Sequence, residues 1–322
     1  MPTPIPPGRA KSTHFDAKNR YWYLIGLLLL AMISHLIGVD GGGTGTRVLV
    51  ADRHGVVLAQ ASAGPSALGQ GVAAAWQSIL SAIKTAFQDL QQETPVWYQC
   101  VLGAGLSGVN NQLWREQFLA MNPGFARIAL ESDAYTALLA AHGGQAGVMV
   151  AAGTGSIAEA LYADGTRRQV GGWGFPVGDE GSGAWMGLRA MSHAQQAVDG
   201  RTPGSPLADQ ILQHCGGSRQ TLQQWCAAAR QYDYAQLART VFDCAHSDPA
   251  AESLLRDAAL ALESMAAALD PKAALPLAIY GSVGRALMPR LAPATRDRCT
   301  PTPQDAAYGA LTLVQQLLEE TP

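Results

Sequence analysis

Residues 36–51 read LIGVDGGGTGTRVLVA, in which two short apolar runs flank a loop of Gly and Thr. The runs Leu36–Val39 and Arg47–Ala51 are typical of strands bounded by turn residues. A third run, Val56–Ala61, follows the turn Arg53-His54-Gly55. Because only short turns join the three runs, they predict an antiparallel meander with the Gly/Thr loop at one end.

Helical and extended patterns alternate after the meander. The sequence predicts helices over Val72–Leu90, Asn110–Met121 and Asp133–His142, and strands over Tyr98–Gly103 and Ala126–Leu130. The resulting βββαβαβα order places the chain in the α/β class.

The plan of strand, Gly/Thr loop and strand occurs again about 110 residues further on. An apolar run over 147–151 leads into Gly153-Thr154-Gly155-Ser156, and a second apolar run ends at Tyr162. This recurrence predicts a duplicated α/β unit. The remaining expected elements are Ala-rich helices over 184–270, a strand over Leu277–Tyr280, a surface connection over Pro293–Pro303 and a last helix over Asp305–Leu318.

Length and composition limit the class of protein. With 322 residues, of which 48% are hydrophobic and 15% charged, the chain is long enough for two domains with buried cores. The net charge of −3 and the lack of a Lys/Arg stripe argue against nucleic acid as a partner. The five cysteines are scattered without CxxC spacing, which predicts a reducing compartment and no zinc cluster.

The N-terminus has a different composition. Residues 1–20 are polar and Pro-rich, and an apolar run of 13 residues follows from Tyr21 to Ile33. This run is short for a membrane span, which needs about 20 residues. We expect residues 1–35 to be an extension outside the fold, with Met32 as the natural start; a membrane anchor and a signal peptide are the alternatives. A cytoplasmic protein without membrane contact is therefore expected.

The Gly/Thr loops have the chemistry of phosphate binding. Asp40–Thr46 joins two strands and opens no helix, which excludes both a Walker A loop and a Rossmann turn. Glycines let backbone N–H groups approach an anion closely, and a carboxylate such as Asp40 can hold hydrated Mg²⁺. A third glycine element, residues 281–284, would let adenine or ribose lie against the backbone, and a plain turn is the alternative for each loop. The candidate nucleotide-binding residues are Gly41, Gly42, Gly43, Thr44, Thr46, Gly153, Thr154, Gly155, Ser156, Gly281, Ser282 and Gly284.

Two further segments carry polar groups suited to a sugar. Asp133 opens a predicted helix, either as its N-cap or as a general base that accepts a hydroxyl proton during phosphoryl transfer. In Gly171–Gly183, Trp173 can stack on a sugar ring, while Asp179 and Glu180 can accept hydrogen bonds from its hydroxyl or amino groups. The alternative for this segment is a structured loop with a core Trp and capping acids.

The order and spacing of these motifs resemble the BadF/BadG/BcrA/BcrD branch of the sugar kinase, Hsc70 and actin superfamily, and within it the glucosamine and N-acetylglucosamine kinases. The resemblance extends from Leu36 to about Leu318. It implies two ribonuclease H-like domains, 36–130 with the C-terminal helix 305–320 and 131–304, whose cleft closes over ATP, Mg²⁺ and a hexosamine. The motifs concerned are Asp40–Thr46, Ser132-Asp133-Ala134, Gly153–Ser156, Gly171–Gly183 and the turn at Gly281.

The same resemblance implies roles for single residues. Asp133 would be the base at the sugar 6-hydroxyl, Asp40 would orient Mg²⁺ and its waters, and Asp179 would bind sugar hydroxyls. Many relatives carry Asn at the position of Ala67 and Lys or Arg at that of Gly45, so altered sugar discrimination and nucleotide affinity are expected. The candidate substrate-binding residues are Ser66, Ala67, Asp133, Gly172, Trp173, Asp179 and Glu180.

The expected function is an ATP-dependent kinase for glucosamine or N-acetylglucosamine, with glucosamine favoured. The expected partner is a small amino sugar, and a homodimer is the expected assembly. Two other classes are kept as alternatives: an iron–sulfur ATPase that activates a dehydratase, and a non-catalytic amino-sugar sensor. The scattered cysteines argue against the first, and the joint presence of Asp40 and Asp133 argues against the second.

Overall fold

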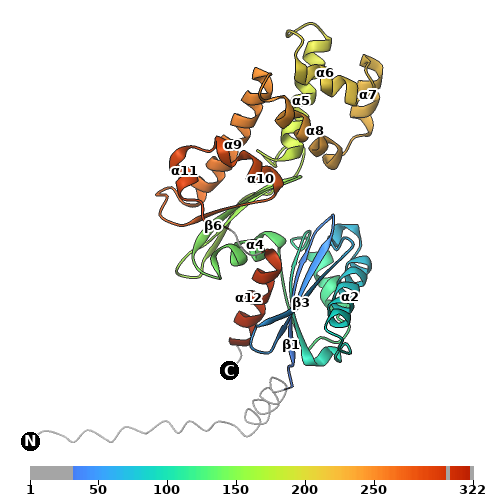
Figure 1. The fold of residues 1–322 in the computed structure, drawn as a ribbon, viewed down its shortest axis with the longest axis vertical. Helices are drawn as coiled ribbons and strands as arrows, with labels where there is room; N and C mark the ends of the chain where they lie inside the picture. Colours follow the sequence, from blue (N-terminus) through green and yellow to red (C-terminus); the bar gives the residue numbers. More distant parts are fainter. Residues whose placement is uncertain (1–31, 302–304, 320–322) are drawn as a thin grey trace, which may run out of the picture.

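The structure, a computed structural model, describes residues 32–301 and 305–319 (Figure 1). Two α/β lobes are stacked along the long axis of the molecule. Of the extension predicted over residues 1–35, residues 1–31 lie outside the described residues, and with them the anchor and signal alternatives. Ile33 is buried, and the Ser34 N–H donates to the Gln99 carbonyl over 2.8 Å, so the fold begins before Leu36.

The first lobe is built on a five-stranded sheet of order β3-β2-β1-β4-β5. The first three strands form the predicted antiparallel meander, and β4 and β5 run parallel to β1. The strands are β1 (His35–Gly41), β2 (Thr46–Asp52), β3 (Val57–Ala63), β4 (Cys100–Leu106) and β5 (Arg127–Glu131).

The second lobe repeats this plan in a four-stranded sheet of order β8-β7-β6-β9. Its first three strands are again antiparallel, and β9 runs parallel to β6. Cys299 makes a single parallel bridge to Leu277 at the free edge of β9, where the first sheet has its fifth strand. The duplicated unit predicted from the two Gly/Thr loops is confirmed. The strands are β6 (Gly147–Ala152), β7 (Ser156–Leu161), β8 (Arg167–Gly171) and β9 (Leu277–Tyr280).

Alternating side chains of the first sheet form two separate cores. Ile37 and Val39 of β1 pack with α2, whereas Leu36 packs with Leu311 of α12 on the opposite face. Trp76 of α2 stacks on Phe118 of α3 at a ring distance of 4.2 Å, which joins the two helices. The elements of this lobe outside the sheet are η1 (Leu68–Gln70), α2 (Val72–Asp89), η2 (Trp97–Gln99), α3 (Gln112–Ala120) and α12 (Ala306–Glu319).

α4 (Asp133–His142) and α12 lie side by side where the lobes meet (Figure 1). Gly309 of α12 faces the Thr136 carbonyl of α4 so closely that a Cβ at this position would overlap it. On its other side α4 packs Leu138 and Leu139 against Met149 of the second sheet. α4 therefore connects the two sheets through packed side chains. The position of its first residue, Asp133, is set by packing against both lobes.

The far end of the second lobe is helical (Figure 1). The buried Asp248 caps α9 by accepting from Ala250 N at 2.8 Å, and its other oxygen accepts from Leu207 N in the first turn of α6 at 2.7 Å. One carboxylate thus fixes two helix starts together. The helices are α5 (Gly183–Val198), α6 (Pro206–His214), α7 (Arg219–Ala228), α8 (Gln231–Cys244), α9 (Pro249–Leu269), α10 (Ser282–Leu287), η3 (Met288–Arg290) and α11 (Pro293–Asp297).

The structure departs from the predicted elements at three places. β8 is missed because Arg167, Arg168 and Gln169 are exposed on an edge strand and give no apolar pattern. The short helix α10 follows Gly281 directly, and α11 begins at Pro293 inside the predicted surface connection. Proline is well suited to the first position of a helix, so the Pro-rich composition of that connection conceals a helical turn.

Candidate active site

The first Gly/Thr loop is a tight turn between β1 and β2. Gly42 N donates to the Gly45 carbonyl over 3.0 Å, and Gly43 and Thr44 are exposed at its tip. The Thr46 hydroxyl is buried; it donates to the Gly64 carbonyl at 2.6 Å and is hydrogen-bonded with the Ser66 hydroxyl at 2.7 Å. The tip is therefore open to the solvent, while Thr46 anchors the loop from beneath.

The segment after β3 supports this turn. Ser66 N and Ala67 N both donate to the Gly42 carbonyl over 3.1 Å. The Ser66 side chain is buried, and it leaves no room for a Cβ on Gly41. The predicted sugar contacts of Ser66 and Ala67 stay predictions, and the contacts described are with the loop itself.

The second Gly/Thr loop is held by the start of α5. Gly153 N donates to the Gly155 carbonyl over 2.9 Å, and the Gly153 carbonyl accepts from Gly183 N at 2.8 Å. The Ser156 hydroxyl donates to the Glu180 carbonyl at 2.7 Å. Thr154 is exposed, so this loop too presents its tip to the solvent.

Asp179 lies behind the second loop. Its side chain is buried, and it accepts hydrogen bonds from Ser156 N at 3.4 Å and Gln231 Nε2 at 2.7 Å. Burial raises the pKa of Asp179 above its usual value. Both carboxylate oxygens thus have partners within the protein, while the neighbouring Glu180 is exposed. Sugar binding by these two acids stays a prediction.

The segment between β8 and α5 exposes Trp173 to the solvent. The Trp173 side chain is 86% exposed, so the alternative of a core Trp is wrong. Gly172, also exposed, has a φ of 70°, a left-handed conformation that favours glycine. Trp173 is therefore free to contact a ligand, and stacking on a sugar stays a prediction.

The third glycine element borders the second loop. Gly281 has a φ of 81°, and a Cβ there would overlap the carbonyl of Ala152, the residue before Gly153. Gly284 is buried against Ile279, whereas Ser282 is exposed. Close packing explains both glycines, and it places residues 281–284 beside the second loop as nucleotide binding would require.

Three carboxylates interact at the ends of these strands. Burial raises the pKa of Asp40 to about 6, and the negative charges of Asp133 and Asp305 act in the same direction, against the opposing charge of Arg47. Arg47 is the cross-strand neighbour of Asp40 and forms an ion pair with Asp305 at 2.6 Å. The structure thus brings together Asp40 and Asp133, as predicted candidates, and adds Arg47 and Asp305.

Asp133 is the first residue of α4, and its N-cap is Ser132. Ser132 Oγ accepts from Tyr135 N at 3.0 Å, so the interpretation of Asp133 as the cap is wrong. The Asp133 carboxylate accepts from Ala134 N at 2.9 Å and is hydrogen-bonded by Ser107, which follows β4. Burial raises the pKa of Asp133, which makes its carboxylate a stronger base.

The carboxylate oxygens near Asp40 suit a cation that also keeps water and phosphate ligands. Within residues 32–301 and 305–319, no three His, Cys, Asp or Glu side chains, the three carboxylates above included, converge closely enough to hold a metal ion by themselves. Mg²⁺ is commonly bound by one or two carboxylates together with substrate phosphates. Burial is the main cause of the raised pKa of Asp40, and the negative charges of Asp133 and Asp305 add to it; a bound cation would favour the charged carboxylate.

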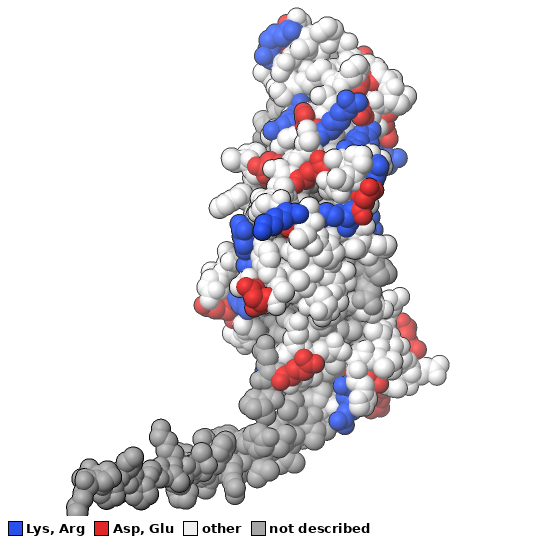
Figure 2. Space-filling view, turned by 90° about the vertical axis from the view of Figure 1, so that its left-hand side faces the viewer, with Lys and Arg blue, Asp and Glu red and all other residues white. Residues whose placement is uncertain are grey.

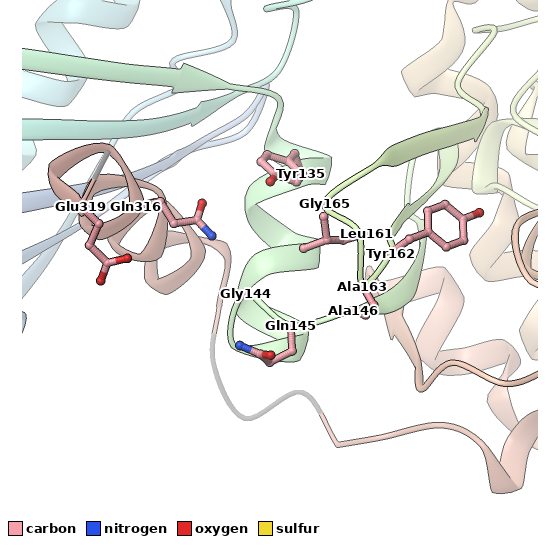
Figure 3. Close-up of a pocket in the computed structure, with 10 residues that line it drawn as sticks. All are labelled: Tyr135, Gly144, Gln145, Ala146, Leu161, Tyr162, Ala163, Gly165, Gln316 and Glu319. Carbon is pink, nitrogen blue, oxygen red and sulfur yellow. The ribbon is translucent and has the colours of Figure 1, made fainter. Parts of the chain in front are cut away.

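A cavity at α4 and α12 is separate from these residues. It has a volume of about 610 Å³ and is lined by α4, the turn after β7 and the end of α12 (Figure 3). Tyr135, Gln145 and Gln316 are among its lining residues, and none of the candidate site residues is.

On the face shown in Figure 2, acidic and basic side chains are interspersed and form no continuous basic surface.

The fold and the paired loops define an actin-like ATPase with two ribonuclease H-like domains. The chain belongs to the BadF/BadG/BcrA/BcrD ATPase family, whose sequence profile matches residues 37–276. The resemblance inferred from the motifs is thereby confirmed.

Three relatives are informative. A glucosamine kinase of Vibrio cholerae is 32% identical over 87% of this chain and 95% of its own length. An N-acetyl-D-glucosamine kinase of Dictyostelium discoideum is 28% identical over 70% of this chain and 76% of its own length. A crystal structure from Chromobacterium violaceum, described as a candidate N-acetylglucosamine kinase, is 48% identical with a TM-score of 0.85, covering 88% of this chain and all of that one.

Proposed function

We propose that this protein is an ATP-dependent hexosamine kinase that transfers the γ-phosphoryl group of ATP to the 6-hydroxyl of glucosamine or N-acetylglucosamine. The observation that carries the proposal is the contact between Asp133 and the turn that follows β1: Ser107 hydrogen-bonds the Asp133 carboxylate, and its N–H donates to the Gly41 carbonyl over 2.9 Å. The similarity to kinases that act on these two sugars supports the substrate class.

The two Gly/Thr loops would hold the phosphates of ATP through backbone N–H groups at their exposed tips. Mg²⁺ would be held by Asp40 through water, and it would neutralise the charge that develops on the transferred phosphoryl group. Residues 281–284, next to the second loop, would lie against the adenine or ribose.

Asp133 would accept the proton of the 6-hydroxyl while the hydroxyl oxygen forms its bond to the γ-phosphorus and ADP leaves. Its hydrogen bonds from Ala134 N and Ser107 orient the carboxylate, and burial keeps it basic. The base thus reaches the acceptor from the start of a packed helix, which favours a fixed geometry.

Glucosamine is the favoured substrate. The relative from Vibrio cholerae, which matches this chain over 95% of its own length, is a glucosamine kinase. Exposed Glu180 would accept a hydrogen bond from the free amino group.

We further propose that the protein is cytoplasmic and forms a homodimer. Across residues 32–301 and 305–319, the helices are all too short or too polar to cross a bilayer.

The test is ADP release with a panel of glucosamine, N-acetylglucosamine, N-acetylmuramic acid and glucose. Release with both amino sugars and little with glucose is expected, and a kcat/KM for N-acetylglucosamine about 10-fold above that for glucosamine would reverse the preference. Binding of the sugars without ADP release would indicate a sensor and contradict the proposal.

A further inference from the structure

A buried carboxylate that the proposed reaction does not use lies in the middle of β7. Glu159 comes three residues after Ser156 of the second Gly/Thr loop, and its side chain is only 4% exposed. A carboxylate in this position needs charged or hydrogen-bonding partners, because burial strongly disfavours an isolated charge. The partners of Glu159 therefore indicate the structural role of its buried carboxylate.

The partners of Glu159 come from the start of α4 and from β8. Ser132 Oγ donates to Glu159 Oε1 at 3.3 Å. Arg167 Nη2 lies 3.8 Å from Glu159 Oε2, and Arg167 Nη1 lies 3.3 Å from Glu131 Oε2 at the end of β5. The Arg167 guanidinium also stacks on the Tyr135 ring at 3.2 Å from its centroid.

The bond to Ser132 matters because Ser132 caps α4. Its hydroxyl oxygen accepts from Tyr135 N, while its hydroxyl proton is donated to Glu159. Both hydrogen-bonding functions of one hydroxyl are therefore used, and they fix the residue directly before Asp133. A single path of contacts runs from Ser156 along β7 to Glu159 and across to the first turn of α4.

We propose that Glu159 is a positioning residue that fixes the start of α4, and with it Asp133, relative to the second Gly/Thr loop. The proposal rests on the function proposed above for Asp133. Glu159 touches neither the phosphates nor the sugar in this account; it acts through Ser132. Arg167 balances its charge and ties the pair to Glu131 and Tyr135.

The first experiment compares Glu159→Ala and Glu159→Gln with the wild-type enzyme in steady-state ADP release. Glu159→Ala is expected to lose about 10-fold or more in kcat, because small displacements of a catalytic group are costly, while KM for ATP and for the sugar stays within about threefold. Glu159→Gln is expected to retain more of the rate, since its amide oxygen can still accept from Ser132. A wild-type kcat in Glu159→Ala would overturn the proposal.

The matched control is Asp270→Asn. Asp270 is also a buried carboxylate of the second lobe, paired with Arg298 at 2.7 Å and accepting from Leu275 N at 2.8 Å. This variant is expected to lower the melting temperature as Glu159→Ala does but to leave kcat unchanged. An equal fall of kcat in both variants would show a general loss of stability and would contradict positioning.

A second measurement is independent of the reaction. Hydrogen exchange of the N–H groups of residues 134–136 is expected to be at least about 10-fold faster in Glu159→Ala than in Asp270→Asn, because only the first variant frees the α4 cap. If Glu159→Ala does not fold, Ser132→Ala removes the same bond from the helix side, with the exposed α7 cap variant Ser218→Ala as its control. An unchanged exchange rate in the variant would overturn the positioning role of Glu159. If the wild-type protein binds ATP but does not phosphorylate the sugar, only the proposed function is overturned.

Discussion

The two Gly/Thr loops share a backbone design but differ in charge. In both, the hydroxyl residue that opens the second strand donates to a carbonyl in the segment after the third strand: Thr46 to Gly64 and Ser156 to Glu180. The cross-strand pair Asp40 and Arg47 of the first loop corresponds in register to Ala151 and Ile157 of the second.

Under the proposed function, this difference would give the two loops of the duplicated scaffold different roles. A backbone turn of N–H groups suffices to bind phosphate, so the duplication can be kept in both lobes. Cation binding needs a carboxylate, and Asp40 provides one in the first lobe alone at this register position. The second loop is instead supported by Asp179 from behind. In the proposed function, Asp133, at the start of the helix between the sheets, would supply the base.

The largest expected effect tests whether the base lies outside both loops. Asp133→Asn is expected to lose about 10²-fold or more in kcat, or about 2.7 kcal/mol of barrier, because an amide has no useful basicity. The fold is expected to persist, since an Asn oxygen can still accept from Ala134 N and Ser132 remains the cap. The measurement is kcat together with the melting temperature, and turnover within threefold of wild type would remove Asp133 from the mechanism.

The next effect tests the charge difference directly. Asp40→Asn is expected to raise the Mg²⁺ concentration needed for half-maximal ADP release by about 10-fold or more, because it removes the carboxylate of the first loop. Ala151→Asn provides the control, since it places the same amide at the corresponding position of the second loop. Equal Mg²⁺ dependence in the wild type and Asp40→Asn would contradict the different roles of the two loops.

The same acid predicts a pH dependence of stability. The folded pKa of Asp40, about 6, is above its usual value of 3.8, so the protonated form is favoured in the folded state. The stability this provides is present below pH 4 and is lost as the pH rises through about 6, a difference on the order of 3 kcal/mol. Without ligands, the free energy of unfolding of the wild type is therefore expected to fall relative to Asp40→Asn over this range. Urea unfolding at several pH values measures it, and parallel curves would contradict the assignment.

The sequence predicts local elements well and long-range contacts poorly. α4 is found at its predicted bounds because Ser132 and Gly143 provide strong start and stop signals, the latter with a left-handed φ of 57°. The same signals still allow Asp133 to be misread as the cap, since Ser132 and Asp133 are both good capping residues. Only the hydrogen bond from Tyr135 N decides between them.

Other site contacts depend on the packing of distant segments. Asp305 meets Arg47 because α12 returns to the first sheet, and no periodicity in the sequence encodes that return. Asp179 has a φ of 60°, and this uncommon conformation accompanies its turn toward Ser156 rather than the solvent. Exposure of Trp173 is likewise a property of its loop and not of its residue type.

A smaller effect compares the two anchoring hydroxyls. Thr46→Val removes the buried hydroxyl that joins Gly64 and Ser66 and leaves both without this partner, which is expected to cost about 1–3 kcal/mol of stability. Ser156→Ala removes one bond to the Glu180 carbonyl and is expected to cost about 1 kcal/mol. Both variants are expected to raise KM for ATP. Denaturant unfolding measures the order, and a larger loss in Ser156→Ala would show that the second loop depends more on its hydroxyl.

The smallest expected effect on stability concerns Trp173, in the segment that supports the second loop and has no aromatic counterpart after β3. Because its side chain is 86% exposed, Trp173→Ala is expected to change the free energy of unfolding by no more than about 0.5 kcal/mol. If the ring stacks on the sugar, the same variant raises KM for the sugar several-fold and leaves KM for ATP unchanged. Val177→Ala, also exposed in this segment but without a ring, is the control and is expected to leave both values unchanged. A rise in KM for ATP instead of sugar would place Trp173 on the nucleotide side of the cleft, and unchanged values for both would show that its exposure serves neither ligand.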